Sequence, residues 1–260
     1  MGFLHRKHDS AGDGLPPGYV TAGSLGHTAN GTPLDRVLLA EIDYDPQRWT
    51  DIPNDWGNGT LYDGPEDFAK TTAEEVWGLW VEQNPGVEKP EQSAVDRTAV
   101  EILSYADKWG GFDPLSPFQV ATYLHRPSPT VSVLPVKVWV DDTPELTVEH
   151  AAGVDNPDAI RPPTVEQFHT EILGAGLKVT CHGTLDPQPG DLPGAQTVWV
   201  QVRYTFAVPT RQAVVTVAAT DTDLGRMSGA LDDIDEFVRQ IHLLQNVPDG
   251  LPVPWSPPAT

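Results

Sequence analysis

The feature that most limits the possible folds is a long alternation of apolar and polar residues between positions 198 and 208. One set of alternate positions holds Val198, Val200, Val202, Tyr204, Phe206 and Val208, and the other holds Trp199, Gln201, Arg203, Thr205 and Ala207. Successive side chains of a strand point to opposite faces, so this pattern predicts a long antiparallel strand with one buried face. Pro209, Thr210 and Arg211 then predict a turn into a second apolar strand at 213–219.

Helical periodicity predicts four helices. The first covers 65–82 and the second covers 92–109, where Gly110 and Gly111 end the apolar pattern. A short third helix is expected from Thr164 to Gly174, because Thr164 and Gln167 have the spacing of a capping box. The last covers 226–243 and places its apolar side chains inward and its carboxylates in water. Its apolar stripe consists of Met227, Leu231, Ile234, Val238 and Ile241, and its carboxylates are Asp232, Asp233, Asp235 and Glu236.

Further strands are expected at 37–42, 119–124, 131–140 and 177–181. Pro135 lies inside the third of these, and proline lacks the N–H that a sheet ladder uses, so the pattern favours an edge strand or a bulge there. Helices and strands come in blocks joined by hairpins. The sequence therefore predicts an α+β fold, an antiparallel sheet with helices packed on it.

The chain divides into three stretches by composition. Residues 1–33 contain few large apolar side chains and are expected to form a flexible leader. Residues 34–247 are expected to form the α+β domain, with a possible seam in the proline-rich stretch 141–163. Residues 248–260 hold five prolines around Trp255 and are expected to form an extended tail.

The order of elements after residue 163 resembles the PsbP-like fold of the LpqN-like actinobacterial proteins. The matching positions are Val208-Pro209 at the end of a long strand, the apolar strand at 214–218 and the amphipathic helix at 227–241. The segment Arg48-Trp49-Thr50-Asp51-Ile52-Pro53 is weakly similar to an early loop of that family. The resemblance implies a binding or accessory scaffold used without catalysis. LpqN-like proteins are typically exported lipoproteins, and this chain has no lipobox cysteine.

Charge and cysteine content exclude several classes of protein. The chain holds 37 acidic and 16 basic residues, a net charge of −21. The charge is even along the chain, −11 in residues 1–130 and −10 in residues 131–260. Binding nucleic acid depends on lysine and arginine, so neither nucleic acid nor an anionic membrane is an expected partner. No apolar run is long enough to insert into a membrane, and no apolar segment follows Arg6 and Lys7 as it would in a signal peptide, so a cytoplasmic location is expected.

Motifs for catalysis, metals or cofactors are not found in the sequence. Cys181 is the only cysteine and precedes His182, but adjacent strand residues point apart, so the two do not form a nucleophile–base pair. Aspartates are plentiful but lack the calcium-loop pattern, and the histidines lack metal-binding spacing. No glycine-rich phosphate loop is present. We therefore predict no catalytic residue, no metal and no cofactor.

The strongest binding candidates are aromatic residues in loops. Trp56 and Tyr62 flank the Gly/Asn-rich segment 57–59, and Trp255 lies in the tail. Such residues either contact a partner or anchor a long loop on the core. Three functions remain open. The first is a soluble, acidic, non-enzymatic accessory or adaptor protein that binds another protein. The others are an immunity or inhibitor protein for a basic toxin, and an enzyme whose carboxylates meet only in the fold.

Overall fold

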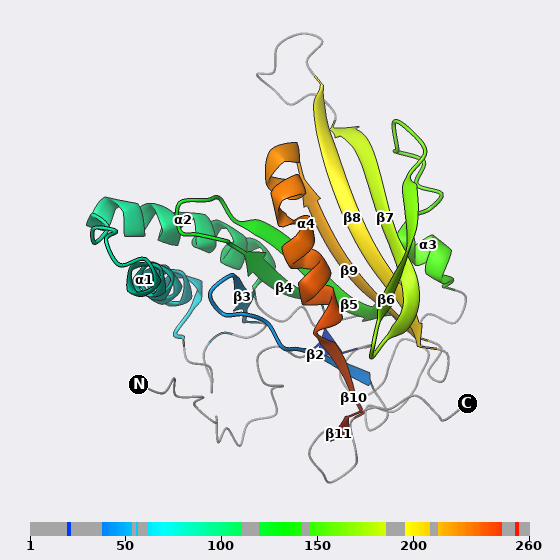
Figure 1. Cartoon of the computed structure of the whole chain (residues 1–260), viewed down its shortest axis with the longest axis horizontal. Helices are drawn as coiled ribbons and strands as arrows, with labels where there is room; N and C mark the ends of the chain where they lie inside the picture. Colours follow the sequence, from blue (N-terminus) through cyan, green and yellow to red (C-terminus); the bar gives the residue numbers. More distant parts are fainter. Residues whose placement is uncertain are drawn as a thin grey trace.

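The computed structural model describes residues 20–21, 38–53, 56, 62–110, 120–141, 146–185, 196–208, 213–245 and 253–254. Within these residues the chain forms a seven-stranded antiparallel sheet, a smaller sheet and four helices (Figure 1). The predicted α+β class, with helices packed on an antiparallel sheet, is confirmed. No helix in the described ranges is long and apolar enough to cross a membrane.

The large sheet supplies the framework of the molecule. In order across the sheet its strands are β3 (Trp49–Ile52), β4 (Val120–His125), β5 (Leu134–Asp141), β9 (Ala213–Asp221), β8 (Thr197–Val208), β7 (Gly174–Leu185) and β6 (Thr164–Thr170). The predicted hairpin is present, because β8 pairs antiparallel with β9 from Val200 opposite Asp221 to Val208 opposite Ala213. The predicted turn residues 209–211 lie outside the described residues.

The smaller sheet joins segments from both ends of the chain. Its order is β1 (Val20–Thr21), β2 (Leu38–Ile42), β10 (Ile241–Gln245) and β11 (Val253–Pro254). β2 pairs with β10 from Ile42 opposite Ile241 to Leu38 opposite Gln245. The side chains of Ile42, Ile241 and Leu243 are buried in the main core, so the small sheet shares the core of the large one.

The two faces of the large sheet carry different kinds of residue. On the first, which we call the α4 face, Tyr204 of β8 and Val217 of β9 pack under α4 (Leu224–Arg239), which crosses in front of the sheet in Figure 1. On the second, the rear face, the same strands present Gln201, Thr205 and Thr220. The alternation in β8 therefore separates an apolar face from a polar one, as its sequence predicts.

Helices α1 (Pro65–Gln83), α2 (Gln92–Trp109) and α3 (Val148–Ala152) cover parts of the rear face. Leu124 packs with α1 and α2 in a second core, whereas its neighbour Tyr123 packs in the core beneath α4. Adjacent residues of a strand point to opposite faces, which places these two helices on the rear side. The bounds of α1 and α2 agree with their predicted ranges.

Two predicted helical segments are wrong in type or length. Residues 164–172 do not form a helix, because 164–170 are strand β6, which pairs with β7 from Thr164 opposite Thr180 to Thr170 opposite Gly174. A local capping-box spacing was outweighed by a full ladder of sheet hydrogen bonds. The last helix ends at Arg239, and Ile241 begins strand β10. The described part of 141–163 contains α3, which packs on the same sheet through the carbonyl of Ala151.

Pro135 lies in an interior strand, which corrects the expectation of an edge strand. β5 pairs with β4 on one side and with β9 on the other. The pairing with β9 begins only at Val136, whereas Pro135 is paired with Leu124 alone. Proline is tolerated here because it lies at the beginning of the strand, where only one neighbouring strand runs alongside.

Two aspartates of α4 are bound to the sheet, which corrects the expectation that all of its carboxylates face water. Asp233 Oδ2 lies 2.8 Å from Nε2 of His125. Asp235 accepts hydrogen bonds from the Tyr204 hydroxyl at 2.5 Å and from the Lys178 ammonium at 2.7 Å. Both aspartate side chains are only about one-fifth exposed, at 20% and 21%. α4 is therefore held by polar contacts at its flanks as well as by its apolar stripe.

The interior of the rear face contains two hydroxyls without a described partner. Thr205 and Thr216 are opposite each other in the β8–β9 ladder, and both are fully buried. Neither Oγ1 atom forms a hydrogen bond within the described residues. A buried hydroxyl without a partner has lost its hydrogen bonds to water and has formed none in the protein, which destabilises the fold.

Replacing Thr216 by valine is expected to stabilise the fold, because it removes an unpaired hydroxyl and keeps the β-branched shape. The gain should be about 1 kcal/mol, a rise in Tm of about 2–4 °C. Thr220→Val is the matched control, since Thr220 has the same face and strand but is exposed and accepts a hydrogen bond from Gln201. Thermal unfolding measures both. A lower Tm for Thr216→Val would contradict this account of the hydroxyl.

Asp51 gives a pH-dependent prediction. Burial raises the pKa of its carboxyl, although the hydrogen bond donated by the Tyr44 hydroxyl at 2.5 Å opposes that rise. The ionised carboxylate therefore destabilises the fold at neutral pH, and protonation removes the cost in acid. Asp51→Asn keeps an acceptor for Tyr44 and should raise Tm by a few degrees at pH 7, with the gain vanishing as pH falls through the pKa of Asp51. Asp232→Asn, on the exposed side of α4, is the control for the loss of one negative charge.

Candidate functional site

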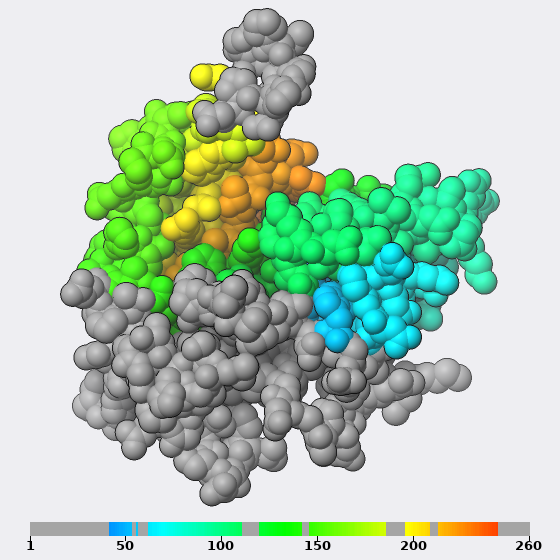
Figure 2. Space-filling view, turned by 180° about the vertical axis from the view of Figure 1, so that it is seen from behind, coloured from blue at the N-terminus to red at the C-terminus, as the bar shows by residue number. Residues whose placement is uncertain are grey.

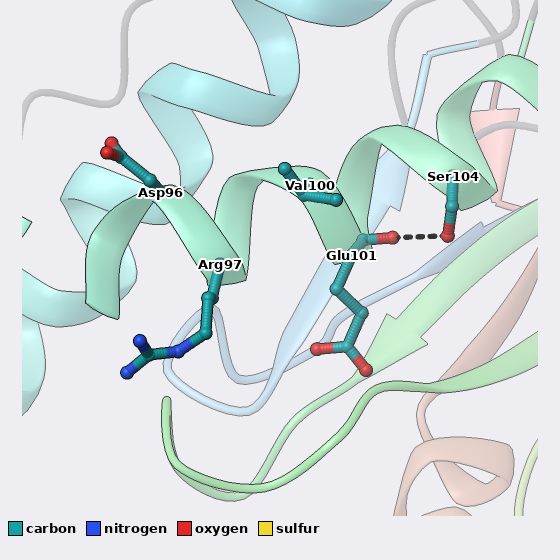
Figure 3. A pocket seen from close by; sticks show the side chains of 5 residues that line it. All are labelled: Asp96, Arg97, Val100, Glu101 and Ser104. Carbon is teal, nitrogen blue, oxygen red and sulfur yellow. Dashed lines mark hydrogen bonds between the residues drawn. The ribbon is translucent and has the colours of Figure 1, made fainter. Parts of the chain in front are cut away.

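Two hollows of similar size on the described surface differ in construction. The first, about 500 Å³, lies along the outer side of α2 and is lined by Asp96, Arg97, Val100, Glu101 and Ser104 (Figure 3). All five side chains come from one helix, so a ligand there would be held from one side only. Glu101, moreover, is already engaged by neighbouring groups.

The second hollow, which we call the aromatic groove, is about 510 Å³ and is walled by six elements. This volume falls within the range of ligand-binding clefts. Its lining consists of Tyr105 and Trp109 from α2, Pro135 from β5, Leu185 from β7, Trp199 and Gln201 from β8, Thr220 and Asp221 from β9, and Thr222 and Arg226 at the start of α4. Figure 2 views this side of the molecule, where the blue-green surface of α2 borders the yellow and orange surface of β8 and β9.

The floor of the groove is the rear face of the sheet. It crosses β5, β9, β8 and β7, which are neighbours in the sheet and span about 14 Å at the usual strand spacing. Trp199 lies flat across Gly183 of β7, because a Cβ at Gly183 would stand 2.1 Å from Cζ2 of the indole. The glycine thus allows the tryptophan to lie against the sheet with its other face toward the groove.

The wall of the groove is the C-terminal part of α2. The rings of Tyr105 and Trp109 are stacked, with centroids 5.2 Å apart and planes inclined by 21°. These residues are four apart on the helix and share one face. Two aromatic rings of the wall therefore line the same groove as a third, that of Trp199 on the floor.

Two lysines lie at the Trp109 end of the groove. The ammonium groups of Lys108 and Lys137 are 4.8 and 4.4 Å from the centre of the Trp109 ring. Burial lowers the pKa of Lys137, and the nearby charge of Lys108 lowers it further. Neither ammonium forms an ion pair with a carboxylate of the described residues. Two adjacent cations that pair with no carboxylate of the described residues are unexpected in a chain with a net charge of −21.

Arg226 lies at another side of the groove and is held in a fixed orientation. Its Nε and Nη2 donate hydrogen bonds to the two carboxylate oxygens of Asp221, at 2.5 and 2.8 Å. Burial alone would raise the pKa of Asp221, but the hydrogen bonds from Arg226, those from the backbone N–H groups of Asp223 and Thr222, and the charge of Arg226 together hold that pKa below its usual value. The pair is bidentate, the geometry in which an arginine is most rigidly placed.

Polar side chains of the floor offer further hydrogen bonds. The Gln201 amide donates to the Thr220 hydroxyl at 2.8 Å across the β8–β9 ladder. This bond leaves the amide oxygen of Gln201 as an acceptor and the hydroxyl hydrogen of Thr220 as a donor. The groove therefore combines aromatic surfaces, cations and a small number of directed polar groups, the composition typical of a binding cleft.

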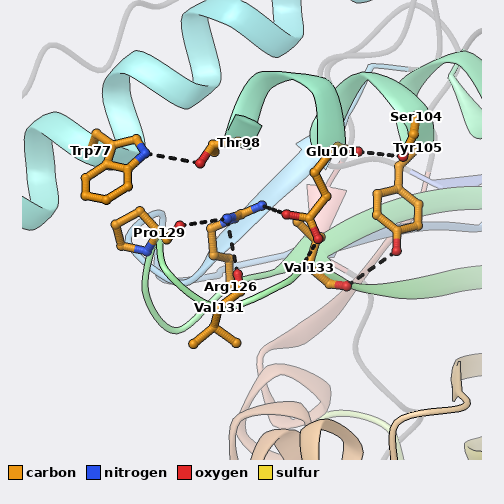
Figure 4. A network of polar contacts seen from close by, with 9 residues as sticks. All are labelled: Trp77, Thr98, Glu101, Ser104, Tyr105, Arg126, Pro129, Val131 and Val133. Carbon is orange, nitrogen blue, oxygen red and sulfur yellow. Dashed lines mark hydrogen bonds and ion pairs between the residues drawn. The ribbon is translucent and has the colours of Figure 1, made fainter. Parts of the chain in front are cut away.

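A polar network fixes α2 against the sheet and so positions the wall (Figure 4). Arg126 is buried, with its side chain 6% exposed, and donates from Nη2 to Glu101 of α2 at 2.8 Å. Glu101 also accepts the backbone N–H of Val133 at 2.8 Å. The Tyr105 hydroxyl donates to the Val133 carbonyl at 3.5 Å. The helix is thus tied to the segment between β4 and β5 next to the groove.

The residues predicted as contacts lie elsewhere. Trp56 and Tyr62 are half-buried and pack against Phe68 of α1, with ring centroids 5.7 and 5.1 Å from it. Trp56 also lies against Gly110, where a Cβ would stand 2.3 Å from its Cζ2. The structure therefore brings Trp56 and Tyr62 together around the second core, apart from the aromatic groove. Trp255 lies outside the described residues.

The sequence held one signal for the groove. Trp199 occupies a polar-side position in the alternating strand, where a large aromatic side chain is exposed unless something covers it. Trp109 gave no comparable signal, because the last residue of a helix can point in many directions. Its meeting with Lys137 depends on how α2 packs on β5, which no local pattern encodes.

Metal binding and catalysis depend on whether ligands cluster in the described part of the chain and on which carboxylates the groove holds. No set of three or more histidine, cysteine or acidic residues there could hold a metal ion. The groove contains one carboxylate, Asp221, and Arg226 engages both of its oxygens. Cys181 is buried and faces Asn156, 3.6 Å from its Nδ2, while His182 points to the other face of β7 and contacts Arg161.

Comparison with known proteins gave no match: no family model, no curated protein and no solved structure is similar to this chain. The resemblance to PsbP-like, LpqN-like proteins accordingly stays a prediction.

Removal of the Glu101 carboxylate should strongly destabilise the fold. Glu101→Ala leaves the buried guanidinium of Arg126 without its counter-ion, a loss of about 3–5 kcal/mol. Glu101→Gln keeps a carbonyl oxygen for one of the two donors and should lose less. Urea unfolding measures both variants, with Asp96→Ala on the exposed side of the same helix as control. Equal stabilities for the alanine and glutamine variants would contradict the role given to the ion pair.

Proposed function

We propose that this chain is a non-enzymatic accessory protein that binds an acidic, extended segment of another protein in the aromatic groove. The observation that carries the proposal is the pair of lysines at Trp109. Lys108 and Lys137 crowd one indole ring without a described carboxylate partner, so a carboxylate of a bound segment would relieve their mutual repulsion.

The shape of the groove supports an extended segment. An extended chain advances about 3.3 Å per residue, so about four residues would cross the four strands of the floor. Trp199, Trp109 and Tyr105 offer flat surfaces for aliphatic or proline side chains, as in the aromatic grooves that receive extended peptides. Gln201 and Thr220 would pair with backbone groups of the segment.

The net charge of −21 does not oppose this assignment at short range. Charges separated by more than a Debye length of about 8 Å are largely screened at physiological ionic strength. The lysine pair acts on its ligand at contact distance, where screening is weakest. The resemblance to LpqN-like proteins implies an accessory scaffold as well, and it is part of the same proposal.

The proposal is tested with a short fluorescein-labelled peptide of repeating Glu-Pro-Leu. Fluorescence polarisation should detect binding to the native chain, and Trp199→Ala should weaken it at least about tenfold, because aromatic anchors dominate such interfaces. Lys137→Glu should weaken binding of this peptide and strengthen binding of a Lys-Pro-Leu counterpart. Trp80→Ala, on α1 and outside the groove, should leave the affinity unchanged.

Two outcomes would overturn the assignment. One is equal affinity of the native chain for the acidic and basic peptides, which would deprive the lysine pair of its role. The other is loss of binding in Trp56→Ala with full binding in Trp199→Ala, which would return the site to the loop around Trp56. Thermal unfolding of each variant distinguishes a lost contact from a lost fold.

A further inference from the structure

Residues 76–81, in the second half of α1, form a run without a polar side chain that is bounded by Glu75 and Glu82. Residues 76–81 read Val-Trp-Gly-Leu-Trp-Val, and none of these side chains is fully buried. In the first half of the same helix, by contrast, Phe68, Ala69 and Ala73 are at most 2% exposed. A short apolar run of this kind is ordinarily packed against protein, and here its side chains keep part of their surface exposed.

The two halves of α1 differ in burial because only the first half lies against the sheet. The second core joins the first half of α1 to Ile52, Leu124 and Val133, which come from β3, β4 and the segment before β5. Trp77 is fixed on α2 by the hydrogen bond from its indole N–H to the Thr98 hydroxyl at 3.1 Å. The α1–α2 hairpin lies to one side of the large sheet, away from β6 to β8 (Figure 1).

Four apolar side chains of this segment belong to neither core. We call them the distal patch, and they are Val76, Leu79, Trp80 and Val81. The loop that follows α1 adds Val87, which is 42% exposed. Leu79 and Trp80 follow Val76 by three and four residues, so the three share one face of the helix, and each is partly exposed. Partly exposed apolar side chains that share a face beside exposed glutamates are characteristic of an interaction site.

The charge around the distal patch selects its partner. Residues 65–91 contain seven acidic and two basic side chains. Glu74, Glu75 and Glu82 are all exposed on the same helix. A second copy of this chain is a poor occupant, because each copy has a net charge of −21 and the two patches would meet acidic rim to acidic rim.

We propose that the distal patch binds a cationic amphipathic helix of another protein. Leucine-type side chains of that helix would cover Trp80 and its neighbours, and lysines at its flanks would reach the glutamates of α1. Helices bind apolar surfaces in this way through residues at helical spacing. Trp80 is the expected anchor, since a partly exposed tryptophan offers the largest apolar area in the patch.

This inference goes beyond the proposed function of the groove and is independent of it. The groove is built on the C-terminal end of α2, whereas the distal patch lies on α1 near the loop that leads into α2. The two surfaces also differ in charge, because lysines border the groove and glutamates border the patch. A chain with both surfaces would join an acidic partner and a basic partner.

The experiment uses the full chain and a synthetic amphipathic helix built from leucine and lysine at helical spacing. Calorimetry should show binding, and circular dichroism should show a gain of helix on mixing. A scrambled peptide of the same composition should bind at least about tenfold more weakly, because it cannot present one apolar face. A leucine–glutamate helix should not bind.

Variants locate the site. Trp80→Ala and the milder Leu79→Gln should each reduce affinity for the leucine–lysine helix, the first by about tenfold or more. Trp199→Ala is the matched control, since it removes a tryptophan from the aromatic groove and should leave this affinity unchanged. The reverse holds for the acidic peptide, so failure of one site is distinguishable from failure of the other.

Three results would overturn the inference. The first is unchanged affinity in both Trp80→Ala and Leu79→Gln with their folds intact. The second is equal binding of the ordered and scrambled peptides, which would indicate attraction to the net charge alone. The third is a concentration-dependent dimer in sedimentation that Trp80→Ala abolishes, which would make a second copy the occupant.

Discussion

Every second side chain of β8 packs beneath α4, and the side chains between them face the opposite direction. A strand with this alternation has to place one face against an apolar layer, and α4 supplies that layer with Met227, Ile234 and Phe237. The rear face is then left with polar and aromatic residues that no long helix covers completely. The aromatic groove exists because α2 and α3 cover only parts of that face.

Charged side chains set the positions of the helices that apolar packing alone would leave free to slide. An apolar stripe is compatible with several offsets along a sheet, whereas an ion pair with good geometry fits one. Asp235 makes such contacts with Tyr204 and Lys178 beneath α4, and Glu101 does so with Arg126 beneath α2. Several of the few cations of this acidic chain are therefore used as fixed points between layers.

The sequence was sufficient to predict those elements whose own pattern of apolar residues was strong. The alternation of β8 and the periodicity of α2 predicted both elements and the α+β class. In these two elements most of the apolar positions given by the sequence period are also buried positions. β6 was misassigned as a helix because the spacing of Thr164 and Gln167 is a local signal. The hydrogen-bond ladder between β6 and β7 forms between separate segments of the chain, and no local spacing reveals it. The groove could not be derived at all, because Lys137 and Trp109 meet only once α2 has docked on β5.

The pairing of β2 with β10 has a practical meaning for anyone who shortens this chain. A fragment beginning at Trp49 would retain all seven strands of the large sheet and all four helices. It would nevertheless remove β2, leaving the backbone of β10 as an open edge and uncovering Ile241 and Leu243. Open edges with apolar neighbours recruit strands from other molecules. A truncation designed around the large sheet alone would thus be prone to self-association, and a well-behaved fragment should keep the small sheet whole, from Val20 in β1 to Pro254 in β11.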